Sequence, residues 1–162
     1  MFCDDNAFWI ELICLALENE SQFKVVAQAS NGRETIEQIE IHRPDIIILD
    51  IVMPEYDGVY IVSHVRKSMR GYSPIVYVLS GFGAYPVVKE LSELGVDFFS
   101  MKPVAVEVIV STIKTLVKYR DNPDQPDHSA EEENARQDVL EAGIKDILLR
   151  LGIMSITHLP NA

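Results

Sequence analysis

The sequence is poor in cysteine and in basic residues, and it contains no long apolar run. Cys3 and Cys14 are its only cysteines; they form no CxxC pair, and this usage favours a reducing compartment over a disulfide framework. No stretch approaches the roughly 18 consecutive apolar residues of a membrane-spanning helix, and no basic and apolar export signal is recognisable. We therefore expect a soluble, cytoplasmic protein with free thiols.

The charge balance is acidic. Lys and Arg number 14 against 25 Asp and Glu, which gives a net charge of −11. Nucleic-acid phosphates would repel such a chain, so the sequence as a whole does not indicate a nucleic-acid binder. The 162 residues, 48% hydrophobic and 24% charged, suit one well-cored globular domain with some residues left over.

Strand and helix signals alternate along the first two thirds of the chain. Short β-rich runs predict strands at 1–3, 23–29, 45–50, 75–79 and 96–101. Apolar residues at helical spacing predict helices at 6–18, 33–41, 58–69, 87–94 and 106–117. This (βα)₅ pattern predicts an α/β fold, a doubly wound five-stranded parallel sheet with the flavodoxin-like strand order 2-1-3-4-5.

The remainder of the chain has a different composition. We predict a domain at 1–120 and an acidic, proline-containing linker at 121–133. In the segment 134–162, apolar residues from Leu140 to Leu151 recur at helical spacing. One amphipathic helix cannot bury its own apolar stripe, so it docks on the first domain, pairs with another chain, or begins a further domain.

Five polar residues lie where predicted strands end. They are Asp4 and Asp5, Asp50, Ser80 and Lys102. The carboxyl ends of parallel strands share one edge of a sheet, where ligands bind. We therefore expect three carboxylates, a hydroxyl and an ammonium to meet in one shallow pocket.

This group of side chains suits phosphoryl chemistry. Two carboxylates ~5 Å apart repel by on the order of 3 kcal/mol at an effective dielectric of 20, and a bound Mg²⁺ relieves that repulsion. Asp50 could then attack phosphorus as an aspartyl nucleophile, while Lys102 and Ser80 help to neutralise the phosphoryl oxygens.

Each residue alone has a simpler interpretation. Asp5 or Asn6 would make an ordinary helix N-cap, Asp50 a loop residue, Ser80 a turn residue and Lys102-Pro103 a strand exit. Their shared predicted edge favours the functional interpretation. The histidines are scattered over turn, helix, linker and tail, and we assign none of them a role: His42, His64, His128 and His158.

Four segments resemble the receiver domain of response regulators. DIIILDIVMPEYDG is similar to the phosphoacceptor segment, CDDN to the acidic pair, VYVLSGF to the switch hydroxyl and FFSMKP to the lysine followed by proline. The spacings of 80 − 50 = 30 and 102 − 50 = 52 residues also agree. The resemblance covers residues 1 to about 120.

The resemblance implies a role for each matching residue. Asp50 is the phosphoacceptor, and it ligates Mg²⁺ (or another divalent cation such as Ca²⁺ or Mn²⁺) with Asp5 and the backbone carbonyl of Val52, while Asp4 helps through water. Ser80 and Lys102 assist at the phosphoryl group, Ser80 and Phe99 form the switch pair, and the Lys102–Pro103 bond is cis.

The resemblance also implies partners and an output. The phosphoryl donor is a histidine kinase or a histidine phosphotransfer protein, and phosphorylation favours a homodimer. The protein is then no enzyme beyond its own phosphorylation and dephosphorylation. MPEYDG, SGFGA, GVDFFSMKP and the tail EAGIKDILLRLGI are most similar to the stage 0 sporulation protein A family, whose DNA-binding effector domain would be truncated here.

Two other functions stay open. A stand-alone receiver could act as a phosphorelay shuttle. Haloacid-dehalogenase-like phosphatases share the aspartate, hydroxyl, lysine and Mg²⁺, but they usually carry a second aspartate two positions after the nucleophile, where this sequence has Val52.

Overall fold

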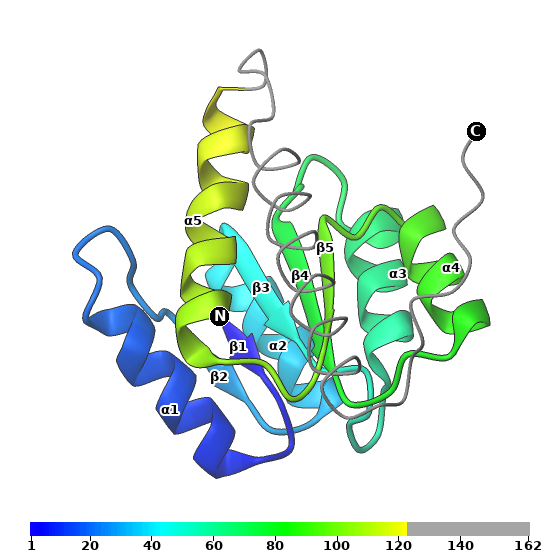
Figure 1. The fold of residues 1–162 in the computed structure, drawn as a ribbon. Coiled ribbons are helices and arrows are strands. Elements are labelled where there is room, and N and C mark those ends of the chain that lie inside the picture. The colour runs from blue at the N-terminus through cyan, green and yellow to red at the C-terminus, as the bar shows by residue number, and fades with distance from the viewer. Residues whose placement is uncertain (123–162) are drawn as a thin grey trace, which may run out of the picture. The chain divides into compact units, whose positions relative to one another are not determined.

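The computed structural model describes residues 1–122, which form one parallel sheet between two layers of helices (Figure 1). The strands are β1 (Phe2–Cys3), β2 (Gln28–Ala29), β3 (Ile46–Leu49), β4 (Ile75–Ser80) and β5 (Phe98–Met101). The helices are α1 (Ala7–Glu18), α2 (Gly32–His42), α3 (Gly58–Ser68), α4 (Tyr85–Glu93) and α5 (Val106–Asp121). No helix within residues 1–122 is long and apolar enough to cross a membrane.

The strand order is β2-β1-β3-β4-β5, and every neighbouring pair is parallel. This order confirms the flavodoxin-like, doubly wound (βα)₅ fold. Helices α1 and α5 cover one face of the sheet, and α2, α3 and α4 cover the other (Figure 1). All five strands therefore direct their carboxyl ends to the same edge.

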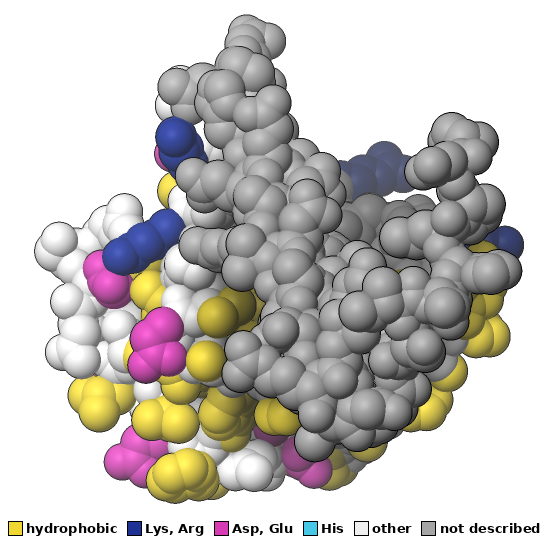
Figure 2. Space-filling view, in the orientation of Figure 1, with side chains coloured by type: hydrophobic (Ala, Val, Ile, Leu, Met, Phe, Trp, Pro, Cys, Tyr) yellow, Lys and Arg dark blue, Asp and Glu magenta, His cyan; other side chains and the backbone are white. Residues whose placement is uncertain are grey.

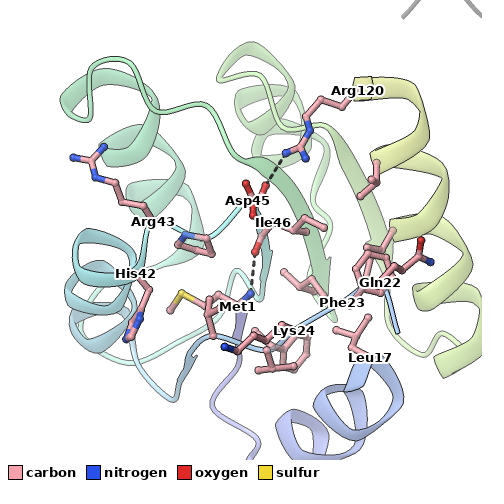
Figure 3. Close-up of a pocket in the computed structure, with 17 residues that line it drawn as sticks. Met1, Leu17, Gln22, Phe23, Lys24, His42, Arg43, Asp45, Ile46 and Arg120 are labelled. Carbon is pink, nitrogen blue, oxygen red and sulfur yellow. Dashed lines mark hydrogen bonds between the residues drawn. The ribbon is translucent and has the colours of Figure 1, made fainter. Parts of the chain in front are cut away.

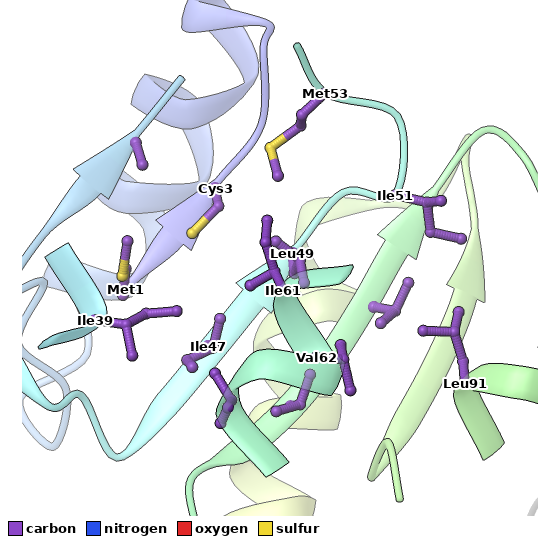
Figure 4. Close-up of a cluster of buried hydrophobic side chains, with 14 of the residues drawn as sticks. Met1, Cys3, Ile39, Ile47, Leu49, Ile51, Met53, Ile61, Val62 and Leu91 are labelled. Carbon is purple, nitrogen blue, oxygen red and sulfur yellow. The ribbon is translucent and has the colours of Figure 1, made fainter. Parts of the chain in front are cut away.

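The two faces of the sheet support separate hydrophobic cores. Along β3, Ile47 and Leu49 belong to the core under α2, α3 and α4, drawn in Figure 4, while Ile48 belongs to the core under α1 and α5. A central strand that packs on both faces needs apolar side chains at every position, which explains the unbroken run before Asp50. Cys3 and Cys14 are buried free thiols, one in each core.

Side-chain caps begin three of the helices. Asn6, Asn31 and Asp57 each accept a hydrogen bond from a backbone N–H three residues later, at the start of α1, α2 and α3 respectively. Such caps satisfy N–H groups that have no partner within the helix. Asn6, and not Asp5, caps α1, so Asp5 is left available for the sheet edge.

Strand β2 is shorter than the sequence predicted. The predicted strand 23–29 is wrong for residues 23–27, because only Gln28 and Ala29 pair with another strand. The physical reason lies in β1, the only strand beside β2 within residues 1–122, which offers just Phe2 and Cys3 as partners. A strand exists only as far as its neighbour supplies hydrogen bonds.

The ends of other elements also differ slightly. Strand β5 begins at Phe98 and not at Val96, and α5 continues to Asp121, one residue into the predicted linker. The rest of that linker and the predicted helix of segment 134–162 lie outside the described residues.

Candidate functional site

Asp4 and Asp5 follow the short strand β1, and their surroundings differ. Asp4 is buried, with 1% of its surface exposed, whereas Asp5 is exposed. The backbone of Asp4 continues the sheet, since its N–H donates to the Ala29 carbonyl at 3.1 Å. One side-chain oxygen of Asp4 accepts the Asn6 N–H at 3.0 Å, which fixes the carboxylate at the strand end.

Asp50 follows β3 and is also buried, at 7% exposure. Its N–H donates to the Cys3 carbonyl at 2.9 Å, so β1 and β3 end side by side. The Oδ1 atom of Asp50 accepts the Val52 N–H at 3.1 Å, which orients the carboxylate from within its own loop. Val52 is the residue whose carbonyl we predicted as a metal ligand; its side chain is exposed, and that ligand role stays a prediction.

Gly58 allows α3 to begin directly beneath the Asp50 loop. Its N–H donates to the Ile51 carbonyl at 2.8 Å, and a Cβ atom at this position would lie 2.6 Å from the Asp50 carbonyl oxygen. Any larger residue would therefore push the loop away from the helix. The Asp57-Gly58 dipeptide signalled a helix start in the sequence but gave no sign of this close approach.

Lys102 joins the two buried carboxylates. Its Nζ donates to Asp50 Oδ2 at 2.7 Å and also to Asp4 Oδ2. The Lys102 N–H donates to the Ser80 carbonyl at 2.9 Å, and the Lys102–Pro103 peptide bond is cis. The structure thus brings together residues 98 positions apart in sequence. The bridge to Asp4 is a contact that the sequence did not predict, because strand-end placement gives an edge but no side-chain pairing.

Burial and ion pairing act in opposite directions on these groups. Burial raises the pKa of the Asp4 carboxyl above its ordinary value, by more than the hydrogen bond from Lys102 lowers it. Burial alone would lower the pKa of Lys102, but its hydrogen bonds with Asp4 and Asp50 outweigh that effect, and the pKa is raised. The geometry therefore favours the ammonium form of Lys102, which partly neutralises the carboxylates.

The three aspartates can hold a hard cation. One carboxylate oxygen from each of Asp4, Asp5 and Asp50 lies within 4.8 Å of the others. Carboxylate oxygens are the ligands that Mg²⁺ and Ca²⁺ prefer, and an exposed Asp5 beside two buried aspartates leaves room for water and substrate oxygens. The donor set therefore fits a divalent ion of this class.

Ser80 ends strand β4, and Phe99 lies within the neighbouring strand β5. Ser80 is fully buried at the end of β4, where its Oγ accepts the Phe82 N–H at 3.2 Å. No hydrogen bond joins the Ser80 side chain to Asp50 within residues 1–122. The Phe99 ring is partly buried against the core, near Gly83. The role of Ser80 and Phe99 as a switch pair, and their movement, stay predictions.

The comparisons with known proteins agree with this geometry. A family model described as the response regulator receiver domain matches residues 1–114. The chain belongs to the response regulator receiver family. It is therefore the receiver of a two-component system.

Solved receivers have the same fold. The receiver domain of the putative response regulator NarL from Mycobacterium tuberculosis is 26% identical, with a TM-score of 0.66 over 72% of this chain and 93% of that one. A LuxR-family DNA-binding response regulator from Staphylococcus aureus is 23% identical, with a TM-score of 0.66 over 71% and 94%. A chain of the CheX-CheY-BeF₃-Mg²⁺ complex from Borrelia burgdorferi is 24% identical, with a TM-score of 0.63 over 72% of this chain and 86% of that one.

Proposed function

We propose that this receiver is switched by phosphorylation of Asp50, with the phosphoryl group supplied by a phosphohistidine. The donor would be a histidine kinase or a histidine phosphotransfer protein. The observation that carries the proposal is the contact of Lys102 with both Asp50 and Asp4, beside a third carboxylate on Asp5. The similar Borrelia complex contains BeF₃ and Mg²⁺, which supports the same chemistry here.

Asp5 and Asp50, with Asp4 acting directly or through water and with the Val52 carbonyl, would hold Mg²⁺. When bound, the ion neutralises charge on the carboxylates and on the phosphoryl oxygens. We also propose that the protein belongs to the stage 0 sporulation protein A family. In addition, Ca²⁺ or Mn²⁺ would be able to replace Mg²⁺ at this site.

The transfer needs no general base. An Asp50 carboxylate oxygen forms the new O–P bond while the N–P bond of the phosphohistidine breaks, and the imidazole nitrogen keeps that electron pair and takes up a proton from water. Lys102 already contacts Asp50 Oδ2, so its ammonium can follow the charge from the carboxylate to the phosphoryl oxygens. Because the Val52 N–H holds Asp50 Oδ1 in place, Asp50 Oδ2 is left to form the bond to phosphorus.

The switch would follow from the added charge. A phosphoryl group on Asp50 adds about −1.5 to −2 charges near Ser80 and attracts its hydroxyl. Ser80 Oγ would then give up the Phe82 N–H for a phosphoryl oxygen, and Phe99 would turn inward. The face formed by α4, β5 and α5 would change its affinity for partners, including a second copy of the chain.

The phosphorylated protein would regulate transcription, and it would do so in the cytoplasm. We propose a sporulation-type regulator that reaches DNA through an effector domain, with the receiver catalysing only its own phosphorylation and dephosphorylation. The phosphatase alternative has less support, because Val52 offers no proton for a leaving group. Rapid multiple turnover on a simple phosphate ester would favour that alternative.

The test is phosphorylation by a small phosphodonor such as acetyl phosphate. With Mg²⁺, one acid-labile phosphoryl group should appear and map to Asp50 by mass spectrometry. Asp50→Asn should abolish it, whereas the matched control Asp121→Asn, an exposed residue at the far end of α5, should not. Undiminished labelling of Asp50→Asn would disprove the proposal.

A further inference from the structure

The methionines of the described chain differ greatly in exposure. Met101 has 55% of its surface exposed, whereas the other three are buried, at 9% or less: Met1, Met53 and Met69. Met1 and Met53 lie in the core under α2, α3 and α4 (Figure 4). Met1 is also held at the wall of a cavity, where its nitrogen donates to the Ile46 carbonyl (Figure 3). Within residues 1–122, Met101 is therefore the one exposed methionine.

Exposed apolar side chains are frequent on this protein, and Met101 differs from the others in its chemistry. Figure 2 shows apolar side chains, in yellow, at the surface of the visible face. Apart from Met101, the exposed large apolar residues of the described chain are all Phe, Tyr, Leu, Ile or Val. Only Met101 among them carries a thioether sulfur, which peroxides oxidise to a sulfoxide.

The two cysteines are poor competitors for such an oxidant. Cys3 and Cys14 are both buried. Peroxides react with the thiolate, so the thiol must first lose its proton. Burial raises the pKa of Cys3 to about 12 and also raises the pKa of Cys14, so both stay protonated near neutral pH. Met101 is therefore the sulfur that an oxidant in solution reaches first.

The Met101 sulfur packs against the loop 81–84 between β4 and α4. A Cβ atom at Gly83 would lie 3.1 Å from Met101 Sδ and 3.3 Å from Phe99 Cζ. Phe99 and Met101 are two residues apart on β5, so their side chains leave the same face of the strand. Both side chains therefore pack at Gly83, and together they hold the loop 81–84 against β5.

This contact lies between the end of β4 and the start of α4. Met101 is level with Ser80 in the ladder between β4 and β5, and the loop 81–84 follows Ser80 directly. At its other end, α4 begins at Tyr85, and the preceding Ala84 provides no side-chain cap. Because no cap fixes the start of α4, its position depends on how the loop is held.

We propose that Met101 is an oxidation site, at which a hydroperoxide forms methionine sulfoxide and thereby loosens the loop 81–84 and the first turn of α4. The exposure of the sulfur and its packing at Gly83 carry this inference. It is independent of the phosphorylation proposed above, because it needs neither Asp50 nor a bound cation.

The reaction is a two-electron oxygen transfer. The Met101 sulfur attacks one oxygen of hydrogen peroxide, so an S–O bond forms while the O–O bond breaks. The transferred oxygen gives its proton to the departing hydroxide, which leaves as water; the sulfur is oxidised and the peroxide is reduced. A sulfoxide oxygen needs hydrogen-bond donors, and the neighbouring Phe99 ring has none. The oxidised side chain therefore turns toward solvent and leaves Gly83.

The first measurement is the rate at which hydrogen peroxide oxidises each methionine of the full chain, followed by mass spectrometry. Met101 should form sulfoxide about tenfold or more faster than Met53 and Met69, because they are buried. In guanidinium chloride the three rates should become equal. Equal rates in the folded protein would overturn the inference, and so would a difference that persists in the unfolded chain.

The second measurement is hydrogen exchange at Phe82, Val87 and Val88, whose N–H groups are bonded within the loop and the first turn of α4. Oxidation should speed their exchange by about threefold or more, whereas the Asp50 N–H, bonded across the sheet, should be unaffected. A methionine sulfoxide reductase with a thiol reductant should restore slow exchange. Unchanged exchange in protein fully oxidised at Met101 would overturn the inference.

Two variants separate the sulfoxide from other effects of peroxide. Met101→Leu keeps the apolar bulk without the sulfur, so its exchange should match the untreated wild type both before and after peroxide. Met101→Gln places a polar group at the same position, so it should exchange as fast as the oxidised protein with no peroxide added. Faster exchange of treated Met101→Leu would assign the effect to another residue and overturn the inference. Slow, wild-type exchange in Met101→Gln would overturn the loosening of the loop.

Discussion

At the scale of single residues, the site depends on a lysine placed between two buried carboxylates. Removing one partner of a buried ion pair leaves an uncompensated charge, and this usually costs more than the pair itself contributes. Asp4 and Asp50 would both lose their counter-ion if Lys102 were neutral. Because the two carboxylates would then repel each other, a bound divalent cation would stabilise the folded state more than it does when Lys102 is present.

Lys102→Gln should therefore lower the free energy of unfolding by about 2–4 kcal/mol in the absence of divalent ions. Addition of Mg²⁺ should raise the Tm of this variant by more than it raises the Tm of the wild type. Thermal unfolding with EDTA and with Mg²⁺ measures both. A smaller Mg²⁺ effect in the variant would contradict the placement of Lys102 as the counter-ion.

A second residue-scale prediction concerns Gly58. The methyl group of Gly58→Ala would fall 2.6 Å from the Asp50 carbonyl oxygen and 2.8 Å from Ile51 Cα, so the loop must move. We expect a loss of about 2 kcal/mol in stability and slower phosphorylation of Asp50. Gly81→Ala is the matched control, since nothing lies within 4 Å of a Cβ there. Chemical denaturation distinguishes them, and equal losses would refute the steric explanation.

At the scale of secondary-structure elements, side chains from loops and helices fix how the strands are joined. Arg66 of α3 donates to the carbonyls of Pro74 and Gly95 and pairs with Asp97 at 3.0 Å. The Asp97 carboxylate in turn accepts the Val76 N–H at 2.7 Å. This network connects α3 to the start of both β4 and β5.

Arg66→Lys should destabilise the receiver by about 1–2 kcal/mol, because a single ammonium cannot reproduce the planar set of donors. Lys67→Gln, at the exposed neighbouring position, should change stability by less than about 0.5 kcal/mol. Urea denaturation of the two variants provides the test. Similar stabilities for both would show that the network contributes little.

Tyr72 links the loop after α3 to the loop before β3. Its hydroxyl donates to the Pro44 carbonyl at 2.6 Å, and burial, with help from Asp45, raises the pKa of Tyr72 to about 12. The raised pKa means that the neutral phenol stabilises the fold fully below the ordinary pKa of about 10. That contribution is lost as the pH rises through 12.

The expected result is a decline in unfolding free energy between pH 10 and 12 that is shallower in Tyr72→Phe than in the wild type. Ultraviolet titration at the tyrosinate band should also lose its late component in this variant. An unchanged titration curve would assign the late component to another tyrosine, such as the buried Tyr77.

The secondary-structure elements were predictable from the sequence where their burial is continuous, and less so elsewhere. The strands at Ile46 and Ile75 were predictable because both faces are buried and the apolar runs are continuous. The strand at Phe23 was overestimated, because residues with high β-propensity form a strand only beside a partner. Strand-end placement correctly gathered the aspartates and Lys102 at one edge, but it could not give their hydrogen bonds.

At the scale of the whole molecule, the sheet separates two hydrophobic cores, and residues 1–121 form one compact unit. The aspartate cluster, Ser80 and Lys102 also lie within this unit. Folding and phosphorylation should therefore require nothing beyond the end of α5. The output would depend on the remaining segment.

A chain cut after Asn122 should unfold cooperatively and should still take one phosphoryl group on Asp50. A chain cut after Thr112 should fail to fold, because it loses Ile113 and, with it, the packing of Leu116 and Val117 on the core under α1 and α5. Circular dichroism melts and phosphate labelling provide the readouts. A shorter chain as stable as the longer one would show that this part of α5 is dispensable.

The bridge from Lys102 has a consequence for the resting protein. Because Lys102 already supplies a positive charge to Asp4 and Asp50, the receiver should keep its fold when no divalent ion is bound. Chelating agents should stop phosphorylation without unfolding the receiver, and adding the ion back should restore phosphorylation at once. The receiver would thus stay folded before phosphorylation, whether or not the ion is present.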